Sequence, residues 1–123
     1  MSKRVLVVDD EQEIVEIFAR KLQANGFDVI TAFSGEEALE KIKMDLPHLV
    51  ILDIRLPGID GTRVFEILKE DELTQNIPVL FVTAVDSPRE IVRHFELGAE
   101  NYLLKPISPK ALLGQVEEIL VTR

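Results

Sequence analysis

Three aspartates in this sequence follow short apolar runs. The run VLVV (5–8) leads into Asp9 and Asp10, and LVIL (49–52) leads into Asp53. Carboxylate oxygens are hard ligands that suit Mg²⁺, and three neighbouring carboxylates repel one another unless a cation lies among them. A carboxylate can also act as a nucleophile and form an acyl phosphate. Asp53 is therefore a candidate nucleophile, and Asp9 and Asp10 are candidate metal ligands.

Two further polar residues follow apolar runs later in the chain, Thr83 after VLFV (79–82) and Lys105 after NYLL (101–104). A lysine could balance a carboxylate and hold a phosphoryl oxygen, and a threonine hydroxyl could donate to another. Each residue alone has an ordinary alternative explanation. Asp10 could be a helix N-cap, Thr83 a β-branched strand residue and Lys105 a solvated charge. Their common position at the ends of successive apolar runs favours one shared site.

The elements that must position these side chains are short apolar runs alternating with amphipathic segments. Continuous runs rich in Val and Ile are typical of parallel strands that are covered on both faces. Strands are predicted at 5–8, 27–32, 49–52, 79–82 and 101–104. Helical spacing of apolar residues is found between the strands and after the last one.

Start and stop signals mark the predicted helices. Ser34 and Ser87 each stand three residues before a glutamate and predict capping boxes, and Asp60 is a further candidate N-cap. Gly26 and Gly98 suit helix C-terminal stops. Five strand–helix units result, which indicate an α/β domain with right-handed crossovers.

The predicted fold is a doubly wound (βα)5 sandwich of the flavodoxin-like type, with a five-stranded parallel sheet in the order 2-1-3-4-5. In such a sheet, ligands collect beyond the carboxyl ends of the strands, where strands 1 and 3 flank the switch point. Asp9, Asp10, Asp53, Thr83 and Lys105 should therefore meet at one edge of the sheet. The positively charged and polar residues Arg89, Arg93 and His94 are interpreted as a solvated face of the fourth helix.

Length and composition limit the class of protein. The 123 residues suit one domain spanning 1–123, and 46% hydrophobic residues are enough for a core. The absence of cysteine excludes disulfides and thiolate metal sites and suits a reducing compartment, so we expect a cytoplasmic protein. No apolar run approaches the length of a transmembrane or signal segment, so no membrane partner is expected. The net charge of −8 disfavours non-specific binding of nucleic acid.

The sequence resembles the CheY-like receiver domains of two-component response regulators. The resemblance covers essentially the whole chain, and its combination of motifs is highly specific. It rests on VLVVDDE (5–11), LVILDIRLPGIDG (49–61), VTA (82–84) and GAENYLLKPIS (98–108). It implies that Asp53 is the residue that accepts the phosphoryl group.

The same resemblance implies a Mg²⁺ site. Asp10 would bind the ion directly, Asp9 mainly through water, and the backbone carbonyl of Arg55 would be a further ligand beside Asp53. The resemblance also implies a catalytic role for Lys105, whose bond to Pro106 is expected to be cis.

Thr83 and Tyr102 match the switch pair of the family. In the resembling proteins the threonine moves toward the phosphoryl group and the aromatic ring turns inward, which reshapes the face formed by the fourth helix, fifth strand and fifth helix. The implied function is a phosphoprotein switch, supplied by a sensor histidine kinase or a phosphotransfer protein. It would not be an enzyme beyond catalysing its own phosphorylation and dephosphorylation. The output is an unknown downstream protein or a fused output domain. The last helix is predicted to end near Thr122, and a stand-alone regulator and a part of a longer one both stay open.

Three other functions are compatible with parts of the pattern. A Mg²⁺-dependent phosphohydrolase would also use an aspartyl phosphate, but such enzymes with a nucleophile on the first strand carry Asp-x-Asp there. A flavodoxin-type nucleotide binder needs an anion-binding loop after the first strand, where this chain has Asp9-Asp10-Glu11. A pseudo-receiver that only binds partners would not need the acidic residues together with Thr83 and Lys105.

Overall fold

The sheet has the predicted strands and the predicted order. The computed structural model describes residues 2–120, so the end of the last helix expected near Thr122 lies outside the described residues. All strands are parallel, in the order β2-β1-β3-β4-β5. They are β1 (Arg4–Val8), β2 (Asp28–Ala32), β3 (Leu49–Leu52), β4 (Val79–Thr83) and β5 (Asn101–Leu104).

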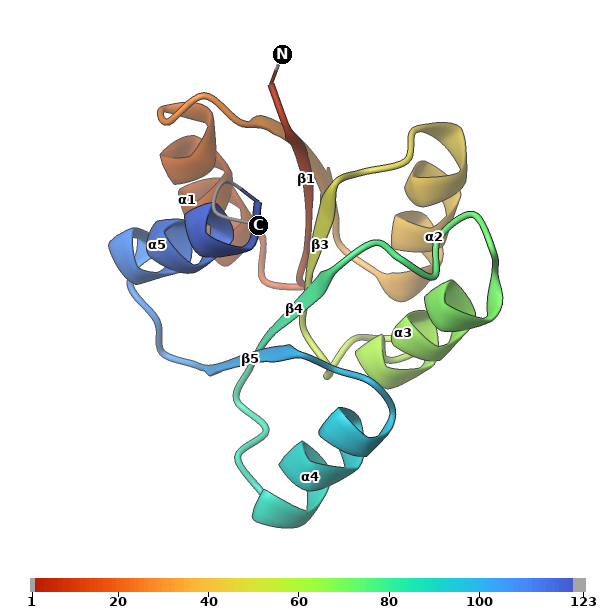
Figure 1. Ribbon diagram of the computed structural model, residues 1–123. Coiled ribbons are helices and arrows are strands. Elements are labelled where there is room, and N and C mark those ends of the chain that lie inside the picture. Colours follow the sequence, from red (N-terminus) through yellow and green to blue (C-terminus); the bar gives the residue numbers. More distant parts are fainter. Residues whose placement is uncertain (1, 121–123) are drawn as a thin grey trace.

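The helices cover both faces of the sheet (Figure 1). They are α1 (Gln12–Gln23), α2 (Gly35–Met44), α3 (Gly61–Glu70), α4 (Pro88–Glu96) and α5 (Pro109–Leu120). One hydrophobic core joins α1 and α5 to the face of the sheet that carries Val5 and Val7. A second core joins α2 and α3 to the opposite face, which carries Leu6 and Val8. The three-layer architecture predicted from the sequence is confirmed.

Burial explains why the central strands read as continuous apolar runs. Every residue of β3 and β4 is buried, because helices lie on both sides of these strands. β2 is an edge strand, in which Asp28 is exposed, the next three residues are partly buried and only Ala32 is buried. This partial burial accounts for its weaker sequence signal.

Side-chain caps fix where four of the helices begin, and at α5 the hydroxyl of Ser108 accepts a hydrogen bond from the N–H of Ala111 at 3.0 Å. Ser34, Asp60 and Ser87 each accept a hydrogen bond from the backbone N–H three residues later, as the sequence predicted. In a capping box the glutamate also accepts a hydrogen bond from the N–H of the N-cap residue. At α2 the Glu37 carboxylate accepts instead from the N–H of Phe33, one residue before Ser34. The alternative role of Asp10 as an N-cap is wrong. Glu11 occupies that position at α1, and no side chain caps it.

Helix α4 lies near β5, an edge strand of the sheet. One of its residues is buried where the sequence predicted exposure. Arg89 and Arg93 are exposed as expected, but His94 is only 2% exposed and is the one buried residue of this helix among those described. The interpretation of His94 as a solvated residue was therefore wrong. After the helix, Gly98 adopts φ of 108°, a conformation that favours glycine and lets the chain turn back toward β5. None of the described helices is long and apolar enough to cross a membrane.

Candidate phosphorylation and metal site

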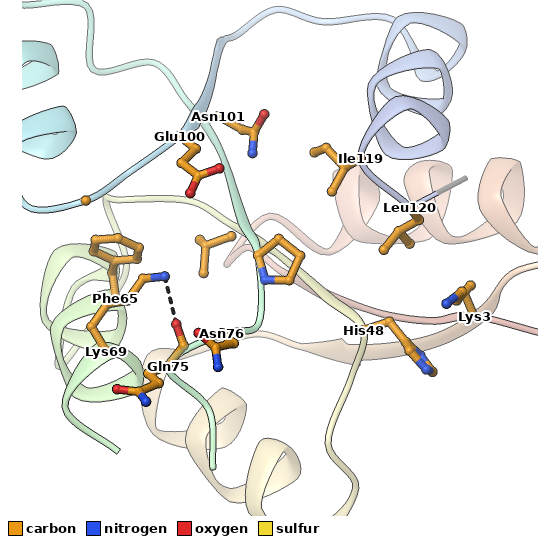
Figure 2. Close-up of a pocket in the computed structure, with 13 residues that line it drawn as sticks. Lys3, His48, Phe65, Lys69, Gln75, Asn76, Glu100, Asn101, Ile119 and Leu120 are labelled. Carbon is orange, nitrogen blue, oxygen red and sulfur yellow. Dashed lines mark hydrogen bonds between the residues drawn. The ribbon is translucent and has the colours of Figure 1, made fainter. Parts of the chain in front are cut away.

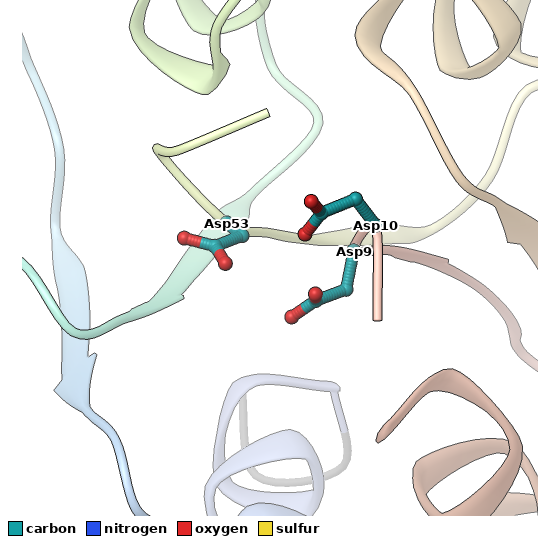
Figure 3. Close-up of side chains that lie close together, drawn as sticks. All are labelled: Asp9, Asp10 and Asp53. Atoms are coloured by element: carbon teal, nitrogen blue, oxygen red, sulfur yellow. The ribbon is translucent and has the colours of Figure 1, made fainter. Parts of the chain in front are cut away.

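Three carboxylates meet beyond the ends of β1 and β3. One oxygen from each of Asp9, Asp10 and Asp53 can be chosen so that all three lie within 4.8 Å of one another. Figure 3 shows the carboxylates grouped at this edge of the sheet. The pairing of β1 with β3 aligns Val8 with Leu52, so the residues that follow each strand emerge side by side. The sequence predicted this convergence.

Two of these carboxylates are buried and the third is open to solvent. Asp9 is 4% exposed and Asp53 is 5% exposed, whereas Asp10 is exposed. Each buried carboxylate accepts a hydrogen bond from the backbone two residues further along. The N–H of Glu11 donates to Asp9 at 3.0 Å, and the N–H of Arg55 donates to Asp53 at 3.2 Å. These bonds hold the carboxylates at fixed positions in the loops that follow the strands.

Lys105 lies between the two buried carboxylates. Its ammonium nitrogen is 2.8 Å from Oδ2 of Asp9 and 2.8 Å from Oδ2 of Asp53, and 3.3 Å from the exposed Glu11. Burial alone would lower the pKa of Lys105, but the hydrogen bonds to Asp53 and Asp9 outweigh it and raise this pKa above its usual value. Burial raises the pKa of Asp9, with Lys105 opposing the shift. The bond from Lys105 to Pro106 is cis, as expected.

Thr83 and Tyr102 are both linked to Val85, in the segment that leads into α4. The fully buried Thr83 hydroxyl accepts a hydrogen bond from the N–H of Val85 at 3.3 Å. The hydroxyl of Tyr102 donates to the carbonyl of Val85 at 2.8 Å. Burial raises the pKa of Tyr102. The two residues predicted to form a switch pair therefore share one contact residue.

Arg55 lies between the carboxylates and α4. Its side chain is 70% exposed and makes an ion pair of 3.6 Å with Glu90 of α4. The direction of this side chain could not be predicted from the sequence. The predicted role of its backbone carbonyl as a metal ligand stays a prediction.

Gly61 is a residue of the site whose role the sequence reasoning missed. It begins α3, and its N–H donates to the carbonyl of Ile54 at 2.8 Å. A β-carbon at this position would collide with the backbone carbonyl of Asp53. The available signal was the glycine directly after the N-cap Asp60, where a close backbone approach is one reason for glycine.

Two cavities lie at opposite ends of the sheet. One of about 400 Å³ is lined by residues such as Lys3, His48 and Asn101 (Figure 2), which lie at or just before the amino ends of strands and so at the opposite end of the sheet from the carboxylates. The other, of about 500 Å³, is mostly apolar and opens between α1 and the loop from β5 to α5. Ile17 and Pro106 line it together with Lys105. Of these two cavities, the second adjoins the carboxylate cluster through Lys105.

A family model described as the response regulator receiver domain matches residues 5–117. The chain belongs to the response regulator receiver domain family. Over 120 residues it is 43% identical to the alkaline phosphatase synthesis transcriptional regulatory protein PhoP of Bacillus subtilis, an alignment that covers 98% of this chain and 49% of that protein. It is 40% identical to the response regulator PleD of Caulobacter vibrioides, with 97% of this chain and 26% of that protein covered.

Solved receiver domains share the whole fold. A CheY-like receiver from Methanospirillum hungatei superposes with a TM-score of 0.91 and 31% identity, covering 99% of this chain and 96% of the other. A response regulator from Chloroflexus aurantiacus superposes with a TM-score of 0.90 and 37% identity, and the alignment covers 98% of this chain and 99% of the other. The chain thus matches whole receiver domains, whereas it spans half or less of the length of PhoP and PleD.

Proposed function

We propose that this receiver domain is a phosphorylation-activated switch that accepts a phosphoryl group on Asp53 from a phosphohistidine of a sensor kinase or phosphotransfer protein. The observation that carries the proposal is the environment of Asp53. Its buried carboxylate lies 2.8 Å from an ammonium group and close to two further carboxylates at the edge of the sheet. Membership of the receiver family supports the same function.

The donor set of the cluster suits Mg²⁺. The side chains of Asp9, Asp10 and Asp53, with the backbone carbonyl of Arg55, would hold the ion through hard oxygen ligands. When bound, Mg²⁺ supplies positive charge that offsets the negative charge of the phosphoryl oxygens. The exposed Asp10 leaves one side of the cluster open to solvent, through which ion and donor can enter.

The chemistry assigned to Asp53 is a single displacement at phosphorus. A carboxylate oxygen forms a bond to phosphorus while the bond from phosphorus to the donor imidazole nitrogen breaks, and the imidazole keeps the electron pair. Lys105 is already placed to pair with an oxygen attached to Asp53. It stabilises the transferred group, and its raised pKa keeps it charged. Apart from this transfer and its reversal by water, we propose no catalytic activity on external substrates.

Thr83 links the site to the α4 side of the domain. Its hydroxyl is bound to Val85, and a phosphoryl group on Asp53 offers it three new acceptor oxygens. Turning toward that group releases the N–H of Val85, the residue whose carbonyl accepts the hydrogen bond from Tyr102. A local change of charge thereby shifts the face formed by α4, β5 and α5, which binds the partner. The partner is a downstream protein or a fused output domain.

The apolar groove beside Lys105 is the proposed docking surface for the phosphodonor. Ile14, Ile17 and Phe18 of α1 line one side, and Pro106 and Ile107 line the other. Ile17 is 46% exposed and lies among the other apolar residues of the groove, and a contiguous exposed apolar surface is typical of a docking site. A histidine-bearing helix packed here would bring its phosphoryl group to the same edge of the sheet as Asp53.

Intact mass after incubation with Mg²⁺ and a small-molecule phosphodonor tests the proposal. We expect one phosphoryl adduct in the wild type and no adduct in Asp53→Ala or without Mg²⁺. If no adduct accumulates, a beryllofluoride titration separates rapid hydrolysis from an inactive site. The absence of beryllofluoride binding would contradict the proposed function and leave a pseudo-receiver.

A further inference from the structure

His94 is a buried polar residue that the proposed phosphoryl chemistry does not use. Its Nδ1 lies 2.6 Å from the carbonyl oxygen of Glu90, so this nitrogen carries a hydrogen and donates. Its Nε2 lies 2.7 Å from the hydroxyl oxygen of Thr62, with which it forms a hydrogen bond. Both ring nitrogens are satisfied although the residue is 2% exposed. His94 is thus held in one orientation by two hydrogen bonds.

The bond between Thr62 and His94 joins two helices with different attachments. Thr62 is in the first turn of α3, directly after Gly61, whose backbone bond to Ile54 fixes this turn against the loop that carries Asp53. α4 packs less deeply, with His94 as its only buried side chain among the described residues. α4 also contacts this loop through the exposed ion pair of Glu90 with Arg55, which contributes little to stability. The bond to Thr62 is therefore the firmer of these two polar attachments of α4.

The ring of His94 also contacts the aromatic residues near the switch pair. Its centroid is 5.3 Å from that of Phe81 in β4 and 6.0 Å from that of Tyr102 in β5. Phe81 stands two residues before Thr83 in the same strand. Movement of α4 away from α3 would change these contacts. The position of His94 is thus coupled to the position of Tyr102.

We infer that the Thr62–His94 hydrogen bond is a latch that holds α4 in the arrangement where the Thr83 hydroxyl is bound to Val85, and so sets how readily this receiver responds to phosphorylation. The inference rests on the proposed function. When Thr83 turns toward a phosphoryl group, Val85 loses a hydrogen bond directly before α4, and the latch resists the shift of that helix away from α3. Thr62 and His94 are positioning residues, because they act through α4 and contact no reacting group.

The consequence is a measurable affinity. A hydrogen bond that favours the arrangement with Thr83 bound to Val85 reduces the population of the arrangement in which Thr83 has turned away. A phosphoryl analogue that requires the second arrangement then binds more weakly by the same factor. Thr62→Val keeps the shape of the side chain and removes the hydroxyl. Loss of one buried hydrogen bond corresponds to a change of about fivefold in such an equilibrium. We therefore expect Thr62→Val to bind beryllofluoride about fivefold more tightly than the wild type.

Thr74→Val is the matched control. Thr74 is also buried, and its hydroxyl donates to the carbonyl of Leu68 at 2.7 Å near the other end of α3. The same substitution there removes a buried hydrogen bond without touching α4. Both variants should lose similar stability in urea denaturation, but only Thr62→Val should change the beryllofluoride affinity. Thr62→Ser keeps the hydroxyl and should bind like the wild type.

The experiment is a beryllofluoride titration with Mg²⁺, followed by the amide NMR signals of α4. Thr62→Ala serves as a second variant if Thr62→Val does not fold. Equal affinities in the Thr62 and Thr74 variants, or weaker binding in Thr62→Val, would overturn the latch while leaving the proposed function intact. A wild-type protein that does not bind beryllofluoride at all would overturn both.

Discussion

The ammonium nitrogen of Lys105 lies 2.8 Å from Oδ2 of Asp53, although α3, β4, α4 and β5 separate the two residues in the sequence. Both side chains are largely buried, with 13% and 6% of their surfaces exposed. Removal of one partner from a buried ion pair leaves an uncompensated charge, which costs much more than the pair contributes net. Lys105 therefore balances the carboxylate cluster at the same place where it would hold a phosphoryl oxygen.

Replacement of Lys105 by methionine should destabilise the domain and make it depend on Mg²⁺. We expect a loss of about 3 kcal/mol in the free energy of unfolding without metal, because Asp9 and Asp53 then face each other without a cation. Millimolar Mg²⁺ should restore part of this loss and stabilise the variant more than the wild type. Urea denaturation with and without Mg²⁺ measures both effects, with Lys110→Met on the exposed part of α5 as control. An equal effect of Mg²⁺ on both proteins would show that Lys105 does not neutralise the cluster.

The sequence predicts the fold well because its strongest signals are also its most buried elements. β3 and β4 are apolar throughout and buried on both faces, so their patterns leave little ambiguity. The convergence of Asp9, Asp53 and Lys105 follows from parallel strands alone, since any residue after a strand lies at the same edge of the sheet.

The failures concern contacts that depend on how helices pack. The sequence indicates a surface position for His94 because Arg89 and Arg93 on the same helix are charged, and only the packing of α4 against α3 reveals its partner Thr62. Asp10 reads as an N-cap because it precedes a helix, but the helix begins one residue later than that role requires. The side chain of Arg55 has several rotamers, and the position of Glu90 on another element selects the one observed.

Gly61 should be intolerant of even the smallest side chain. Alanine normally stabilises a helix relative to glycine, but here its β-carbon would collide with the carbonyl of Asp53. We expect Gly61→Ala to destabilise the domain by about 2 kcal/mol and to slow phosphorylation of Asp53, because the backbone of that residue must shift. Denaturation and intact-mass measurements check the two effects.

Gly114 provides the matched control for this substitution. It lies within α5, and a β-carbon there would have no atom within 4 Å. Gly114→Ala should therefore stabilise the domain by about 0.5–1 kcal/mol and leave phosphorylation unchanged. Opposite signs for the two variants are the expected result. Gain of stability in both would mean that the contact between Gly61 and Asp53 relaxes without cost.

Glu37 should contribute stability that depends on pH. The N–H of Phe33 donates to its carboxylate at 2.7 Å, and this bond, aided by Lys41 and opposed by burial, lowers the pKa of Glu37. A carboxylate with a lowered pKa in the folded state stabilises that state above its unfolded pKa, and this contribution is lost as the pH falls through the folded pKa. Glu37→Gln should cost about 0.5 kcal/mol at pH 7, because the group is partly exposed. The difference in stability between Glu37→Gln and the wild type should disappear in acid, below the pKa of Glu37 in the folded protein. Denaturation at several pH values checks this, and a constant difference, or one equal to that of the exposed Glu40→Gln, would contradict it.

Ile17 should matter for transfer from a protein donor and not for the chemistry at Asp53. It is 46% exposed in the groove beside Lys105, so a lysine there adds a charge to the proposed docking surface without disturbing the core. We expect Ile17→Lys to slow transfer from phosphorylated histidine kinases, tested as a panel, by at least about tenfold, because burying the new charge against an apolar partner is unfavourable. Phosphorylation by a small-molecule donor should be unchanged.

Met44 of α2 is 84% exposed and far from the groove, which makes Met44→Lys the control for added charge. Equal rates for the two lysine variants would place the docking surface elsewhere, while slower reaction of Ile17→Lys with the small donor would show that the groove shapes the site itself.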